Sequence, residues 1–87
     1  MEVTGEFHGL IVSSRGALSD NELREVQEFI EARDFNLALE TLCGFLIDRN
    51  RDVSPELYLR IHSIGERLDG VDPYLLESVK AIVVSTD

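Results

Sequence analysis

The residues that could do chemistry are few in this chain and stand far apart. A metal site needs several ligands at short spacings, and His8 and His62 occur in no His-x-x-x-His or Cys-x-x-Cys pattern. His62 precedes Glu66 by four residues, which is the spacing of a solvated pair on one side of a helix. We therefore expect no metal ion, and nothing in the pattern indicates another cofactor.

Candidates for nucleophilic or acid–base catalysis are equally sparse. A catalytic serine or cysteine needs a neighbouring base, and the single cysteine, Cys43, lies among apolar residues that favour a buried thiol. Asp69 and Asp72 flank Gly70 and could share a pocket, but an aspartate directly before Pro73 is more typical of a helix cap. We therefore predict no catalytic residue and a protein that is not an enzyme.

A set of acidic residues is the remaining feature. Its members are Glu22, Glu25, Glu28, Glu31, Asp34 and Glu40. The chain has 17 acids against 8 lysines and arginines, a net charge of −9, which disfavours nucleic acid and anionic membranes and favours a basic protein partner. A solvated helix side that aids solubility is the simpler interpretation. However, only Arg24 and Arg33 offset these acids, so a basic partner would relieve their repulsion.

Length and composition indicate one domain, residues 1–87. A chain of this size buries roughly 60–65% of its unfolded surface, so we expect a modest core that a partner or a second copy, as in a homodimer, would stabilise. The N-terminal residues lack the features of a secretory signal, and no stretch approaches the ~20 apolar residues of a membrane span. With no cysteine pair, we expect a cytoplasmic protein.

Residues 34–50 are expected to form the central helix. Their apolar side chains cover most of the helix circumference, which is typical of a helix buried by neighbours on several sides. These side chains are Phe35, Leu37, Ala38, Leu39, Leu42, Cys43, Phe45, Leu46 and Ile47.

An amphipathic helix is predicted just before it, over residues 18–33. Ser19 and Glu22 have the spacing of a capping box, and Asp34 is the natural N-cap of the central helix. Because almost no loop separates the two helices, they should form an antiparallel αα-hairpin.

Two further helices and an uncertain N-terminus complete the expected fold. Ser54-Pro55 and Asp72-Pro73 begin helices, although the β-branched run AIVVST could be extended instead. Residues 1–17 contain three glycines and could be irregular, hold a short helix over about 6–14, or hold a strand through 10–12. The predicted fold is all-α, a small bundle of four or five helices.

Much of this pattern resembles the MafI-type immunity proteins of bacterial toxin systems. The resemblance covers about residues 18–77. It is carried by LSDNELREVQEFI at 18–30, Asp34-Phe35, LALETLC at 37–43, Ser54, Glu56, Tyr58, Ile61 and Asp72-Pro73. Family members usually have glycine before the acid and a small residue after the aromatic, where this chain has Arg33 and Asn36.

The resemblance implies a protein that binds and neutralises a cognate toxin domain, often a nuclease. Nuclease domains tend to be basic, so an acidic bundle could cover one with electrostatically steered association. We predict the six acids named above as contact residues, with Tyr58 and Tyr74 as aromatic anchors and Phe7 as a further candidate. The alternative is a helical adaptor or scaffold that holds a peptide or partner subunit through the hairpin.

Overall fold

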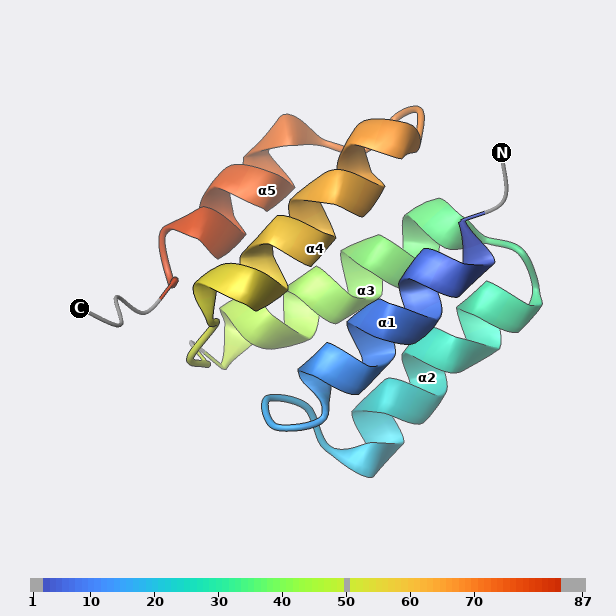
Figure 1. Cartoon of the computed structure of the whole chain (residues 1–87), viewed down its shortest axis with the longest axis horizontal. Helices are drawn as coiled ribbons and strands as arrows, with labels where there is room; N and C mark the ends of the chain where they lie inside the picture. Colours follow the sequence, from blue (N-terminus) through green and yellow to red (C-terminus); the bar gives the residue numbers. More distant parts are fainter. Residues whose placement is uncertain (1–2, 50, 84–87) are drawn as a thin grey trace.

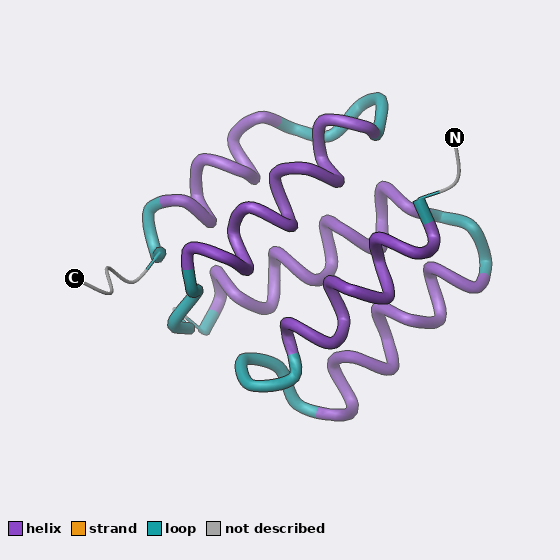
Figure 2. Tube along the Cα trace, in the orientation of Figure 1, coloured by secondary structure: helices purple, strands orange, loops and turns teal. Residues whose placement is uncertain are grey.

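Five helices make up the computed structural model, which describes residues 3–49 and 51–83 (Figure 1). They are α1 (Thr4–Ser14), α2 (Asp20–Glu31), α3 (Phe35–Asp48), α4 (Pro55–Arg67) and α5 (Pro73–Lys80). Figure 2 shows these helices joined by loops, with no strand in the described residues. The predicted all-α bundle of four or five helices is confirmed.

The helices lie with α3 at the centre of the arrangement. In Figure 1, α3 runs behind α1 and α4, with α2 along one edge of the molecule and α5 along the other. Helix α3 contacts both α2 and α5, while α1 contacts α4. Phe7 of α1 stacks on Phe35 of α3 with ring centroids 5.6 Å apart, which joins the front helices to those behind.

Helix α3 supplies the middle of the core. Its residues Ala38, Leu39, Leu42, Cys43 and Leu46 are fully buried. Not every apolar side chain of α3 is buried, because Leu37 is 39% exposed. Glu40 and Asp48 are exposed on the same helix. Neighbours therefore cover most of α3 and leave one side open.

Local capping explains where the helices begin. The Glu22 N–H donates to Ser19 Oγ (3.2 Å) and the Ser19 N–H donates to Glu22 Oε1 (2.9 Å), so the predicted capping box is confirmed. Ser54 Oγ and Asp72 Oδ1 accept from backbone N–H groups in the first turns of α4 and α5 (3.1 Å and 2.9 Å). These caps satisfy N–H groups that have no partner within the helix.

The turn between α2 and α3 has an unusual backbone. Arg33 adopts a φ of +62°, the left-handed region that normally favours glycine. The Asp34 N–H donates to the Phe29 carbonyl (2.9 Å), which closes the end of α2 over this residue. Asp34 stands at the predicted N-cap position, but its side chain makes no capping hydrogen bond.

The N-terminal segment is a helix and not a strand. Phe7, Leu10 and Ile11 are buried on one side of α1, and this burial outweighs the low helix propensity of the glycines. The strand considered for residues 10–12 is wrong because these side chains share one helical face and do not alternate between two.

The described part of the β-branched run, residues 81–83, begins as a turn, because Ala81 keeps a right-handed helical backbone and its N–H donates to the Glu77 carbonyl (3.0 Å). Helix α5 ends at Lys80, and Val83 forms an isolated parallel bridge with Val53. Predictions for residues 1–2, 50 and 84–87 lie outside the described residues.

Candidate partner-binding surface

Two residues considered for metal binding or catalysis, His62 and Cys43, have structural roles. His62 Nδ1 lies 3.3 Å from Glu66 Oε1 on the surface of α4, the pair that the spacing predicted. Cys43 is fully buried, and burial, with a smaller contribution from the charge of Glu40, raises its pKa to about 12. At neutral pH this thiol is protonated and therefore poorly nucleophilic. Among the described residues, no three or more metal-ligating side chains gather at one place.

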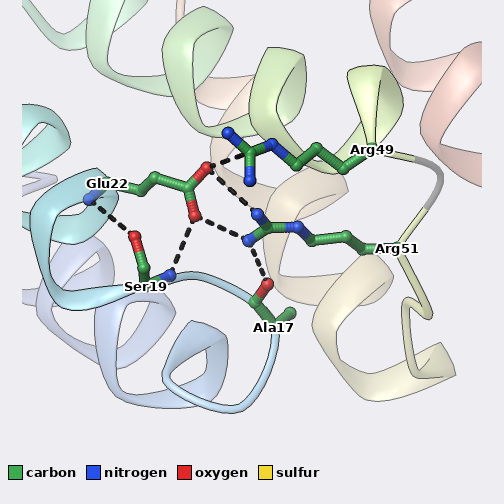
Figure 3. A network of polar contacts seen from close by, with 5 residues as sticks. All are labelled: Ala17, Ser19, Glu22, Arg49 and Arg51. Atoms are coloured by element: carbon green, nitrogen blue, oxygen red, sulfur yellow. Dashed lines mark hydrogen bonds and ion pairs between the residues drawn. The ribbon is translucent and has the colours of Figure 1, made fainter.

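Glu22 turns away from the outer side of α2 and into the molecule (Figure 3). It is only 8% exposed. Its two carboxylate oxygens accept from the Arg51 guanidinium at 2.6 and 3.1 Å, and Arg49 Nε lies 4.0 Å away. Arg51 also donates to the Ala17 carbonyl, so the contact joins the loop before α2 to the chain that follows α3.

The inward direction of Glu22 corrects its expected place on the acidic outer side. As the third residue of α2, it reaches back to the Ser19 N–H, and this geometry turns its carboxylate toward Arg51. The hydrogen bond from the Ser19 backbone, followed by the hydrogen bond and charge of Arg51, outweighs the opposing effect of burial and lowers the pKa of Glu22. The carboxylate is therefore a structural charge and is already occupied.

The other acids of α2 are exposed and have no cationic partner in the described part of the chain. Glu25, Glu28 and Glu31 form no ion pair or side-chain hydrogen bond with another described residue. Four of the arginines contact other acids. Arg49 and Arg51 contact Glu22, Arg60 contacts Glu56, and Arg67 contacts Glu6. Glu25, Glu28 and Glu31 therefore keep an excess of negative charge on α2 that no ion pair between described residues neutralises.

These three acids do not all face the same way. Glu28 and Glu31 line a shallow groove of about 390 Å³ between α1 and α2, together with Arg15 and Arg24. Glu25 does not line this groove; it follows Glu22 by three residues and so stands on the side of α2 that approaches α3. The acids therefore wind around the outside of α2.

Asp34 and Glu40 occupy different surroundings. Asp34 is exposed in the α2–α3 turn, close in sequence to the end of α2. Glu40 is exposed on the side of α3 nearer to α5, because Asn36, one turn earlier, donates to the Asp69 carbonyl in the α4–α5 loop. The structure therefore groups Asp34 with the acids of α2 and separates Glu40 from them.

The aromatic candidates are distant from the acids of α2. Tyr74 is 80% exposed at the start of α5, which lies at the opposite edge of the molecule from α2 (Figure 1). Tyr58 is half-buried on α4, with its ring 5.8 Å from that of His62. Phe7 is fully buried, so its consideration as an anchor was wrong; it is a core residue.

Three exposed apolar side chains escaped the sequence prediction. They are Val12 (59% exposed), Leu37 and Leu59 (64%). Leu59 could have been recognised, because it stands outside the spacing of the inward-facing Leu57 and Ile61. The exposure of Leu37 could not have been recognised from the sequence, because its helix carries apolar residues on nearly every side.

Comparison of the chain with family models, with curated proteins and with solved structures gives no match. None of the helices in the described ranges is long and apolar enough to cross a bilayer.

Proposed function

We propose that this chain binds and neutralises a basic protein, in the manner of an immunity protein that inhibits a cognate toxin domain. The observation that carries the proposal is the division of charge. Glu6, Glu22 and Glu56 have arginine partners, whereas Glu25, Glu28 and Glu31, on the exposed sides of α2, have none among the described residues.

Electrostatics would serve such a partnership mainly through the rate of encounter. An excess of one charge sign on an exposed helix attracts an oppositely charged surface and accelerates diffusional association by roughly 10–10³-fold. The effect weakens with salt, since the Debye length is about 8 Å at physiological ionic strength. Rapid capture suits an inhibitor that must reach a toxin before the toxin reaches its substrate.

The proposed mechanism requires occlusion and no chemical step. Helices α2 and α3 form an antiparallel hairpin with a buried inner side, so their outer sides are presented on a firm support. A surface of this kind inhibits by covering part of the toxin domain. The resemblance of residues 18–77 to MafI-type immunity proteins is consistent with this mode of action.

The test uses the C-terminal domain of the polypeptide encoded directly upstream of this gene. We expect that domain to arrest growth when produced alone, co-production of this chain to restore growth, and the purified pair to elute as one complex. If the domain remains fully active with the chain in excess and no complex elutes, the chain is not its immunity protein.

An adaptor that holds a peptide or partner subunit is the second candidate. Exposed Leu59 on α4 and Tyr74 on α5 favour it, because both are large side chains available to a partner on helices other than α2. The net charge of the natural partner distinguishes an immunity protein from an adaptor. A neutral or acidic partner in the co-purified complex would favour the adaptor.

A further inference from the structure

One side of α3 is not covered by the other helices within residues 3–49 and 51–83. Its residues recur at the spacing of a single helical face. They are Leu37, Glu40, Thr41, Gly44 and Asp48, named here the α3 face, and each is exposed or half-exposed. The opposite side of the helix, which includes Ala38 and Leu42, is fully buried.

We propose that the α3 face is covered by the basic protein partner, with Leu37 making the central apolar contact. This inference rests on the proposed function and assigns that function to one surface. It places the interface on the outer side of the hairpin, where α3 meets the flank of α2 that carries Glu25.

Gly44 is the first observation that supports this assignment. A Cβ atom added at Gly44 would meet nothing within 4 Å among the described residues, so no contact inside the chain explains the glycine. Glycine in the interior of a helix is destabilising. Gly44 stands in the middle of the α3 face, and its lack of a side chain leaves room for a partner backbone to approach α3 closely.

The charge of α3 is the second observation. Helix α3 contains no lysine or arginine between Phe35 and Asp48, while Glu40 and Asp48 are exposed and form no ion pair with a described residue. Asp48 also stands at the C-terminal end of the helix, where the partial negative charge of the backbone makes another acid unfavourable. Two separate basic side chains of a partner would neutralise these carboxylates, because Glu40 and Asp48 are about two helical turns apart.

The acidic flank of α2 extends the same complementarity. Glu25 lies on the side of α2 that approaches α3, so it borders the α3 face at the flank away from Glu40, and it has no ionic partner among the described residues. The groove between α1 and α2 is a poorer match for a basic partner, because Arg15 and Arg24 line it beside Glu28 and Glu31. The α3 face is therefore the better complement to a positively charged surface.

A pair of matched substitutions tests the assignment. Gly44→Arg and Gly5→Arg add the same side chain and charge at two helical glycines, the first half-exposed and the second exposed, and at neither position would a Cβ meet another described residue within 4 Å. The probe is the C-terminal domain of the upstream polypeptide, and the dissociation constant is measured by isothermal titration calorimetry. We expect Gly44→Arg to weaken binding at least 100-fold and Gly5→Arg to change it less than threefold.

A second variant and a fold control complete the experiment. Leu37→Ser should weaken binding about tenfold or more, because it removes the proposed apolar contact. The far-ultraviolet circular dichroism spectrum of each variant should match that of the unmodified chain. If Gly44→Arg fails this control, Gly44→Gln replaces it. Gly44→Gln adds bulk without charge and is expected to weaken binding at least tenfold.

The possible results distinguish the two proposals. If the unmodified chain binds the probe and both α3 variants bind it as tightly as the unmodified chain does, the assignment of the interface to the α3 face is wrong. The proposed function stands in that case. If equal losses follow Gly44→Arg and Gly5→Arg, added charge is responsible and the assignment is again wrong. If the unmodified chain does not bind the probe, the proposed function and this inference fall together.

Discussion

Glu22 shows how a single carboxylate can link three segments of the chain. Through Arg51 it connects the α1–α2 loop at Ala17 with the start of α2 and with the segment that follows α3 (Figure 3). Removing one partner of a buried pair usually costs more than the pair contributes, because the other charge is left uncompensated. Glu22 is therefore expected to matter for stability even though neighbouring acids on α2 do not.

We predict that Glu22→Gln lowers the free energy of unfolding at pH 7 by about 1–3 kcal/mol. Because the folded pKa of Glu22 lies below its ordinary value of 4.5, its contribution is present above that pH and is lost as pH falls through the folded pKa. The difference between the two proteins should therefore shrink below pH 4.5. Urea denaturation at several pH values measures it.

Glu25→Gln is the matched control for this prediction. Glu25 is exposed on the same helix and has no ionic partner among the described residues, so its substitution should change stability by less than about 0.5 kcal/mol. Equal effects of the two substitutions would contradict a structural role for Glu22.

At the scale of elements, the hairpin of α2 and α3 determines most of the architecture. It combines a turn in a left-handed backbone conformation at Arg33 with an inner side of α3 that is fully buried. The turn sets the direction in which α3 leaves α2, and the burial of α3 holds the remaining helices in place. Each feature can be tested by substitution.

We predict that Arg33→Gly is more stable than Arg33→Ala by about 1 kcal/mol. Glycine adopts the left-handed region without the steric conflict that a Cβ creates, which costs roughly 1–2 kcal/mol. Both variants lose the arginine side chain, so comparing their urea midpoints isolates the backbone effect. An alanine variant as stable as the glycine variant would contradict the left-handed turn.

We predict that Leu42→Ala lowers the free energy of unfolding by about 2–5 kcal/mol. Leu42 is fully buried in α3, so the substitution leaves a cavity in the middle of the core. Leu59→Ala removes the same atoms from a side chain that is 64% exposed and should cost less than about 1 kcal/mol. Chemical denaturation of both variants gives the comparison, and a small effect at Leu42 would mean that α3 is not the core helix.

At the scale of the whole molecule, charge is unevenly distributed between the two edges. The acids of α2 lie along one edge, and α5 with exposed Tyr74 lies along the other (Figure 1). Long-range steering depends on where the net charge is concentrated and not only on its total. The position of a charge reversal should therefore change the rate of association with a basic partner.

We predict that reversing Glu25, Glu28 and Glu31 to lysine slows association with a basic toxin domain at least tenfold at low salt. Reversal of Glu66, Asp69 and Glu77, which are exposed on or beside α4 and α5, changes the net charge equally and should have a smaller effect. Stopped-flow fluorescence measures both rates. Equal slowing by the two sets would show that the total charge of the molecule, and not the position of the acids on α2, controls association.

The sequence by itself determined the helices and most of their ends. Caps such as Ser19 and Asp72 act on backbone groups within about three residues, and the apolar period of a helix is also a short-range pattern. These signals can be interpreted without knowing the tertiary fold. The left-handed conformation of Arg33 was harder to predict, because arginine is not the residue that such a turn normally favours.

Only the tertiary structure decided which side chains are available to a partner. Glu22 is occupied because Arg51, 29 residues later, reaches it, and Phe7 is buried because Phe35 stacks against it. Tyr74 is separated from the acids of α2 because α3 lies between the two edges. Each outcome depends on contacts between residues distant in sequence, and helical periodicity does not specify which helices come together.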